Sequence, residues 1–113
     1  MSRPSSDRLD DIRDAIARCR QYAVDTTSED VRVAAMALDA IVRNIMVIGE
    51  AANHLPDSVT SAMSEIDWPA VRGMRNILIH EYFRIDYAIV RDVIEKELLP
   101  LDNAIAAYQT TLS

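Results

Sequence analysis

An arginine and a histidine stand five residues apart in the segment RNILIHEY, which runs from Arg75 to Tyr82. Histidine titrates near neutral pH, so His80 can take a proton from a ribose 2′-hydroxyl or give one to a leaving oxygen. The permanently charged guanidinium of Arg75 can hold a phosphate while negative charge builds in the transition state. Asn76 can add a hydrogen bond to the phosphate or orient the histidine. These side chains suit metal-free cleavage of an RNA phosphodiester bond.

The spacing of Arg75 and His80 limits how one helix can use them together. Five residues advance about 500° on an ideal helix, which leaves the two side chains roughly 140° apart. They converge if the helix ends or distorts near His80, or if a second subunit completes the cleft. Tyr82 returns close to the face of Arg75. A purely structural interpretation also stands, in which either residue caps a helix or makes a surface ion pair.

Other kinds of active site find little support in the sequence. The chain has two histidines, His54 and His80, and one cysteine, so no zinc-ligand cluster is expected. It also has no glycine-rich phosphate loop and no indicated nucleophile–base pair. We therefore predict no metal and no cofactor. His54 is interpreted as a helix-end residue and Cys19 as a small packing residue.

Composition predicts a single helical domain over residues 1–113. Half of the residues are apolar, only 5% are aromatic and two are glycine. A single cysteine fits a reducing cytoplasm, and the apolar runs are too short to cross a membrane, so we expect a cytoplasmic protein without membrane association. The net charge of −6 argues against broad nucleic-acid binding but permits a local basic site. Arg72 and Arg84 can supply that site or be ordinary surface charges.

Apolar residues at three- and four-residue spacing predict the helices. The first helix follows an N-cap at Ser5 or Ser6 and is broken at residues 26–28. The second runs from about Glu29 to Asn53 after a capping box of Thr27 and Asp30. Its apolar face begins at Val31 and is widened by Met46, Val47 and Ala51, which fits a central helix or a dimer surface.

The second half of the chain predicts shorter elements. Residues 57–64 form either a short helix or an irregular connection. Asp67 then caps a helix that has Pro69 in its first turn and contains the segment RNILIHEY, with Val71, Met74, Ile77 and Leu78 facing inward. Trp68 is interpreted as a core or staple residue. Asp86 caps a last helix, which Pro100 kinks or restarts. The prediction is an antiparallel bundle of four main helices plus a short extra one.

The chain resembles the HepT-like branch of the HEPN superfamily, the toxin half of HEPN–MNT toxin–antitoxin pairs. The family signature is an arginine, a polar residue, three variable residues, a histidine, one residue and a tyrosine, which Arg75, Asn76, His80 and Tyr82 match in full. Further similarity lies in the run IGEAA at residues 48–52, in Trp68 and in Ile85-Asp86. It covers residues 9–101.

The resemblance implies a metal-independent endoribonuclease that acts as a homodimer, with its active cleft where two subunits meet. Arg75 and His80 would be the catalytic pair, and Asn76 a helper. Tyr82 would accept adenylyl groups from a minimal nucleotidyltransferase antitoxin. Added AMP would place bulk and negative charge where RNA phosphates must lie. Tyr82 has its own structural alternative, as a packing tyrosine at a helix end.

Two questions remain open from the sequence. Glu50 either faces solvent or pairs across the bundle with Arg75 or Arg72, and such a pairing would support the site. Gly49 would allow a neighbouring helix to approach closely. The alternative function is a non-catalytic helical module that dimerises and binds a nucleotidyltransferase partner or a nucleotide. The acidic composition suits that alternative, whereas the intact Arg75/His80 pair favours the enzyme.

Overall fold

The computed structural model describes residues 3–80 and 87–112, and for residues 75–80 it describes the helix backbone. These ranges contain helices and turns and no strand, so the all-α prediction is confirmed. The helical elements, in chain order, are α1 (Ser5–Asp25), α2 (Val31–Asn53), α3 (Asp57–Thr60), η1 (Ser61–Met63), α4 (Trp68–His80), α5 (Tyr87–Val93), η3 (Ile94–Leu98) and α6 (Leu99–Thr111).

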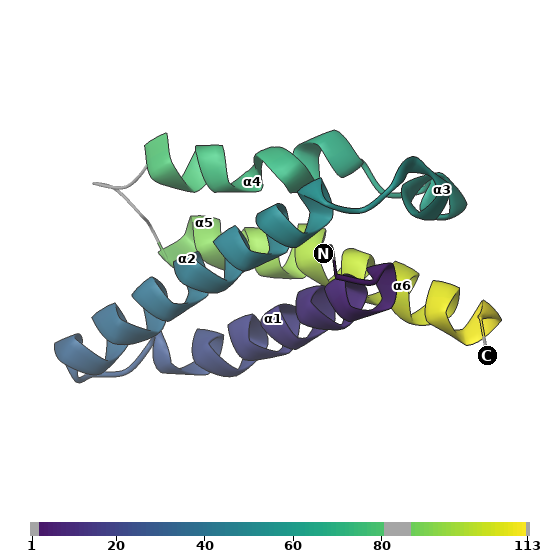
Figure 1. Ribbon diagram of the computed structural model, residues 1–113. Coiled ribbons are helices and arrows are strands. Elements are labelled where there is room, and N and C mark those ends of the chain that lie inside the picture. The colour runs from purple at the N-terminus through teal and green to yellow at the C-terminus, as the bar shows by residue number, and fades with distance from the viewer. Residues whose placement is uncertain (1–2, 81–86, 113) are drawn as a thin grey trace.

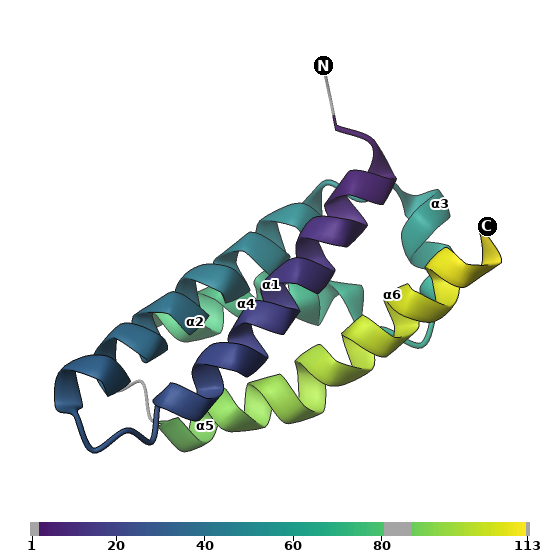
Figure 2. The same ribbon diagram turned by 90° about the horizontal axis from the view of Figure 1, so that it is seen from below.

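The long helices pack as an antiparallel bundle (Figure 1). Helices α1 and α2 form a hairpin, and α4 runs back over α2 in the opposite direction. The run α5–η3–α6 returns along the other side of α1, as the view from below shows (Figure 2). The short elements α3 and η1 connect α2 to α4. This is the predicted bundle of four main helices with a short extra one.

The core is built from the aliphatic faces of these helices. Isoleucines and leucines of α1, α2, η3 and α6 are almost fully buried, among them Leu9, Ile12, Ile16, Ile41, Ile45, Ile48, Leu98, Leu101 and Ile105. Helix α4 adds Trp68, Val71 and Met74, and the side chains of Ile77 and Leu78 lie outside the described residues. The period of three to four residues in the sequence therefore predicted the buried faces. Val31 is an exception, because it is 80% exposed at the first residue of α2. The apolar face of α2 is thus wider than the core that covers it.

Cys19 belongs to this core. Its side chain is fully buried and its thiol contacts the carbonyl oxygen of Ile41, with Sγ and O 3.8 Å apart. Burial raises the pKa of the Cys19 thiol to about 12, although the charge of Arg18 opposes the shift. The interpretation of Cys19 as a packing residue is confirmed.

We expect Cys19 to resist alkylation by iodoacetamide at pH 8 in the native protein and to react fully in denaturant. The thiolate is the reactive form, and the folded chain holds the thiol neutral and out of solvent. Because the folded pKa is raised, stability falls as pH rises above the ordinary cysteine value of 9.0. Mass spectrometry of the labelled chain measures the reaction. Rapid labelling of the native protein would contradict this placement of Cys19.

Two of the predicted helix starts are wrong. Pro4 occupies the N-cap position of α1 and no side chain caps it, so Ser5 and Ser6 lie within the helix. At α2, Asp30 is the cap, since its carboxylate accepts a hydrogen bond from the Arg32 backbone N–H at 2.9 Å. The hydroxyl of Thr27 instead donates to the Val24 carbonyl at the end of α1. A short polar side chain can satisfy backbone groups on either side of a turn, and the sequence does not show which side it chooses.

The start of α4 agrees with the prediction. The Asp67 carboxylate accepts a hydrogen bond from the Ala70 N–H at 3.1 Å, and Pro69 lies in the first turn. Trp68 is buried, and its indole N–H donates to the Met63 carbonyl at 3.1 Å, which ties η1 to α4. Asp86, the predicted cap of the last helix, lies outside the described residues.

Pro100 changes the helix type in the turn that precedes it. The segment η3 is a π-helix of 5 residues that leads directly into α6, which has the proline in its first turn. Proline has no N–H to donate, and its ring collides with the carbonyl four residues earlier in a regular helix. The wider turn of η3 accommodates the ring, so the last helix bends without ending.

Candidate functional site

Helix α4 carries the residues that the sequence singled out for chemistry. Asp67 and Trp68 fix its first turn, and its described part runs as far as His80. Arg75, Asn76 and His80 therefore lie on its C-terminal half. The predicted end or distortion of the helix near His80 concerns residues 81–86, which lie outside the described residues. Tyr82 lies outside the described residues, and its role stays a prediction.

Gly49 sets the distance between α2 and α4. It is buried, and a Cβ built on it would lie 3.5 Å from the Arg72 carbonyl oxygen and 3.6 Å from that of Val71. One added carbon makes ordinary contact there, whereas a longer side chain would meet the backbone of α4. The expected close helix approach is confirmed. It holds the start of α4 firmly against the C-terminal part of α2.

Arg72 is half-buried on α4 and reaches the end of α2. Its Nε donates to the Ala52 carbonyl oxygen at 3.4 Å. This position places a positive charge at the C-terminal end of a helix, where the helix dipole favours it. Arg72 therefore ties α4 to α2, and its guanidinium is not paired with Glu50.

Glu50 projects from α2 into solvent. Its side chain is 61% exposed, and a carboxylate oxygen lies 3.6 Å from Nδ1 of His54. His54 is the C-cap residue of α2, as its interpretation as a helix-end residue required. Of the two arginines considered for Glu50, Arg72 makes no ion pair with it, and its Nε donates to Ala52 instead. The side chain of Arg75 lies outside the described residues, so a pairing of Glu50 with Arg75 stays a prediction.

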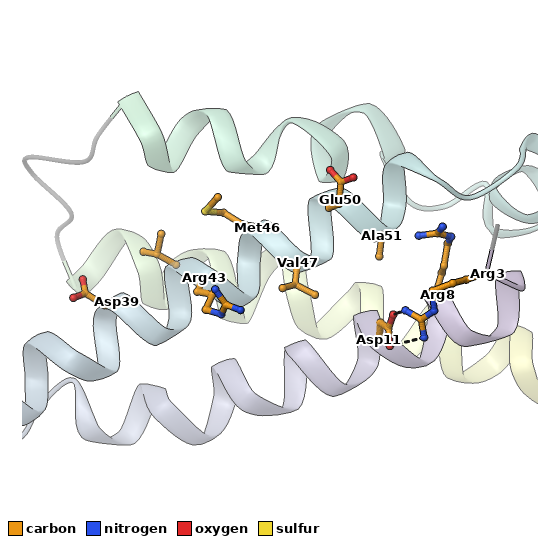
Figure 3. A pocket seen from close by; sticks show the side chains of 10 residues that line it. Arg3, Arg8, Asp11, Asp39, Arg43, Met46, Val47, Glu50 and Ala51 are labelled. Carbon is orange, nitrogen blue, oxygen red and sulfur yellow. Dashed lines mark hydrogen bonds and ion pairs between the residues drawn. The ribbon is translucent and has the colours of Figure 1, made fainter. Parts of the chain in front are cut away.

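A groove runs along the exposed side of α2, beside the N-terminal end of α1 (Figure 3). Its volume is about 680 Å³, and apolar and charged side chains line it together. They are Val42, Met46, Val47 and Ala51 with Asp39, Arg43 and Glu50 from α2, and Arg3, Arg8 and Asp11 from or beside α1. Arg3 pairs with Asp11. One signal of this surface was visible in the sequence, the widening of the apolar face of α2 at Met46 and Val47.

Asn44 is a buried polar residue that the sequence analysis did not single out. Its amide oxygen accepts a hydrogen bond from Arg18 Nε at 2.8 Å, and its amide nitrogen donates to the Ala40 carbonyl at 2.8 Å. On the other side of α1, Arg13 donates to Asp102 of α6 at 2.9 Å. These bonds fix α1 between its neighbours. The visible signal was an asparagine inside the apolar run of α2.

Two further observations concern the whole of the described chain. Among residues 3–74 and 87–112, whose side chains the structure describes, no group of three or more histidine, cysteine, aspartate or glutamate side chains is placed to hold a metal ion. In the same ranges, no helix combines the length and the apolar character needed to cross a membrane.

Comparison with known proteins identifies relatives of most of the chain. A family model described as ribonuclease HepT-like matches residues 12–108. A Methanocaldococcus jannaschii protein named "Gamma-glutamylcyclotransferase and putative RNase" is 32% identical over 97 residues, which are 86% of this chain and 44% of that protein. A "Putative RNase" of Caldanaerobacter subterraneus is 39% identical over 66 residues, covering 58% of this chain and 59% of the relative.

A relative of similar length is the "Probable ribonuclease HepT" of Thermococcus cleftensis. It is 29% identical over 98 residues, which are 87% of this chain and 89% of that protein. The chain spans about half the length of the first two relatives, 44% and 59%. No solved structure matches the chain significantly.

Proposed function

The chain belongs to the HepT-like ribonuclease family, and we propose that it acts as a metal-independent endoribonuclease. The observation that carries the proposal is the family match over residues 12–108, which includes Arg75, Asn76, His80 and Tyr82 in one segment. The structure supports it by placing the first three on the C-terminal half of one helix, whose start is fixed against α2.

The chemistry follows from the two side chains at the centre of the segment. His80 takes the proton of a ribose 2′-hydroxyl, and the oxygen attacks the adjacent phosphorus while the bond to the 5′-oxygen of the next nucleotide breaks. Arg75 holds the phosphate oxygens as their charge grows, and Asn76 adds a hydrogen bond to them or to the histidine. The products are a 2′,3′-cyclic phosphate and a free 5′-hydroxyl. No metal takes part in these steps.

The site is proposed to lie between two copies of the chain. One segment contains one histidine, whereas the reaction needs a base for the 2′-hydroxyl and an acid for the leaving oxygen. Two copies of His80 at one cleft would supply both. This arrangement also removes the difficulty that Arg75 and His80 diverge on a single straight helix.

Regulation is proposed to act on Tyr82. A minimal nucleotidyltransferase partner would transfer AMP from ATP, so that the phenolic oxygen binds the α-phosphorus and pyrophosphate leaves. The added phosphate and nucleoside bring negative charge and bulk beside the site and exclude RNA. The chain would then be the toxin and its partner the antitoxin, both acting in the cytoplasm.

One experiment separates this enzyme from a silent helical module that dimerises and binds a nucleotidyltransferase. The net charge of −6 favours the second function, because an acidic surface repels nucleic acid. We expect the purified, unmodified chain to cut RNA of mixed sequence in the presence of EDTA. Gel analysis of several RNAs measures the cleavage. If all of them stay intact, the chain is the silent module.

A further inference from the structure

One exposed stripe of α2 repeats with the spacing of a coiled coil. Its members lie alternately four and three residues apart and are Arg32, Met36, Asp39, Arg43, Met46 and Glu50. All of them are exposed. A repeat that averages 3.5 residues keeps one line of side chains along a helix and is typical of a helix that packs lengthwise against another. We call this set the α2 stripe.

The chain itself does not account for the α2 stripe. Met36 is 68% exposed and Met46 is 39% exposed, although methionine gains free energy by burial. Among the residues whose side chains are described, 3–74 and 87–112, the guanidinium groups of Arg32 and Arg43 and the carboxylate of Asp39 have no hydrogen-bond or ion-pair partner. A line of unpaired charges with methionines between them indicates an interaction surface.

We propose that the α2 stripe packs antiparallel against the α2 stripe of a second copy of this chain. The two-fold axis would pass between the helices at the level of Ile41. Asp39 would then face the partner subunit's Arg43, Met36 the partner subunit's Met46, and Arg32 the partner subunit's Glu50. This interface deepens the proposed function and rests on it in one respect, because the site is proposed to need two subunits.

The order of the charges selects this arrangement. In the antiparallel register every charged member of the α2 stripe meets an opposite charge, and methionine meets methionine. A parallel arrangement would place each charge against its own copy. An antiparallel shift by one heptad would place Glu50 against the partner subunit's Asp39, or Arg32 against the partner subunit's Arg43. These alternatives are disfavoured by like-charge repulsion.

The groove beside the α2 stripe supplies space for the partner. Asp39, Arg43, Met46 and Glu50 line it together with Val47, and its volume is about 680 Å³ (Figure 3). In the proposed register this half of α2 receives the N-terminal half of the partner helix. The partner subunit's Met36 would enter the groove against Met46. Burying these side chains removes apolar surface from water while the charges on both sides are paired.

The interface also brings the two candidate sites together. Helix α4 runs antiparallel to α2 (Figure 1). Gly49 lies against the backbone at Arg72. Along α4, His80 lies eight residues beyond Arg72, and along α2, Ile41 lies eight residues before Gly49. Each interval is about 12 Å along its helix axis, at a rise of 1.5 Å per residue. The backbone of His80 is therefore near the level of the proposed axis.

The axis keeps both α4 helices on one side of the α2 pair. Glu50 of the α2 stripe and Gly49, which faces α4, are sequence neighbours and so lie about 100° apart around α2. The partner helix and α4 thus occupy adjacent sides of α2. A two-fold axis that lies in the interface, perpendicular to α2, therefore places the α4 helices of both subunits on the same side of the α2 pair. The two Arg75–His80 segments would approach each other with their C-terminal ends, as a shared cleft requires.

Charge reversal tests the interface. We expect Asp39→Arg or Arg43→Asp alone to raise the dimer dissociation constant by about a hundred-fold, since each creates two like-charge pairs at a two-fold interface. The double variant reverses both partners and should return to within about ten-fold of wild type. Sedimentation equilibrium without RNA measures the constants. The proposal would be overturned if the wild-type protein is monomeric at micromolar concentration. It would also be overturned if each single variant has the dissociation constant of the wild type.

Matched control variants exist on α1, away from the α2 stripe. Asp14 and Arg20 are exposed beside a second groove, which Arg13 and Asp102 also line. Asp14→Arg and Arg20→Asp change the net charge by the same amounts as the test variants. They should leave the dissociation constant unchanged. A loss of dimer in these controls equal to that in the test variants would assign the effect to net charge and reject the register.

Cysteine cross-linking tests the register itself. With oxidised glutathione as oxidant, two thiols become one intermolecular disulfide and glutathione is reduced. We expect a mixture of Met36→Cys and Met46→Cys chains to cross-link at least ten-fold faster than either variant alone. Cys19 is buried and does not compete. Rapid cross-linking of Met46→Cys with itself would indicate parallel packing and overturn the proposal.

These measurements are independent of the proposed ribonuclease. A dimer that follows the charge rules but leaves RNA uncut retains the interface and rejects the enzyme. RNA cleavage by a dimer that ignores the α2 stripe retains the enzyme and rejects the interface.

Discussion

Replacement of His80 by alanine is expected to lower the rate of RNA cleavage by about a hundred-fold to ten-thousand-fold, the usual contribution of general acid–base catalysis. The effect falls at the upper end if both copies of His80 serve one cleft, because the variant then loses the acid and the base together. His80 lies at the last residue of α4, so the substitution leaves the first turn of that helix and its contacts with α2 in place. Cleavage of a labelled RNA in EDTA measures the rate.

His54→Ala is the matched control for this prediction. His54 is the other histidine of the chain, it is exposed, and it lies at the end of α2. Its loss should leave the cleavage rate within about two-fold of wild type, since an exposed surface residue contributes little to the fold. Circular dichroism and sedimentation check that both variants stay folded and dimeric. A His80→Ala chain with wild-type activity would reject His80 as the catalytic base.

Replacement of Tyr82 by phenylalanine is expected to separate cleavage from its control. Phenylalanine lacks the phenolic oxygen that would accept AMP, so the variant should keep its cleavage rate and gain no mass when produced with the nucleotidyltransferase. The wild-type chain should gain whole AMP units and lose cleavage by about ten-fold or more, because the added negative charge repels RNA phosphate. Intact-mass spectrometry and the RNA assay give the two readings.

Tyr87→Phe provides the control for Tyr82. Tyr87 begins α5 and lies five residues later in the sequence, with the Arg91 guanidinium 6.0 Å from the centre of its ring. This variant should be adenylylated and inhibited like the wild type. Modification of Tyr82→Phe to the wild-type level would show that another residue accepts AMP.

The fold was predictable because its helices carry strong periodic signals. Ile41, Ile45 and Ile48 mark the buried side of α2, and Asp67 with Pro69 marks the start of α4. The predicted cap at Ser5 or Ser6 was wrong because the helix already begins at Ser5, after Pro4. The predicted cap at Thr27 was wrong because its hydroxyl bonds back to the Val24 carbonyl at the end of α1. The π-helix before Pro100 depends on how the chain relieves a clash, which the sequence leaves open.

The residues of the candidate site could be predicted from the sequence, whereas the partners of their neighbouring side chains could not. The sequence indicated Arg75, Asn76, His80 and Tyr82, and the structure places the first three on α4. Glu50 does not pair with Arg72, whose Nε instead donates to the Ala52 carbonyl at the end of α2. Choices between such partners depend on tertiary distances of a few ångströms.

The α2 stripe shows a similar limit. Its heptad spacing is present in the sequence, but the exposure of Met36 and Met46 is what identifies it as a surface. An apolar position at helical spacing is equally compatible with a core. Only the packed fold shows that α1 and α4 cover other sides of α2 and leave this one open.

The chemistry of the RNA ends tests the central claim most directly. Unmodified, purified protein is incubated with RNA in EDTA, and the termini of the fragments are identified by mass spectrometry. Attack by the 2′-hydroxyl, with His80 as base and Arg75 on the phosphate, predicts 2′,3′-cyclic phosphate ends and 5′-hydroxyl ends. Fragments with 3′-hydroxyl and 5′-phosphate ends, or RNA that stays intact, would contradict the account.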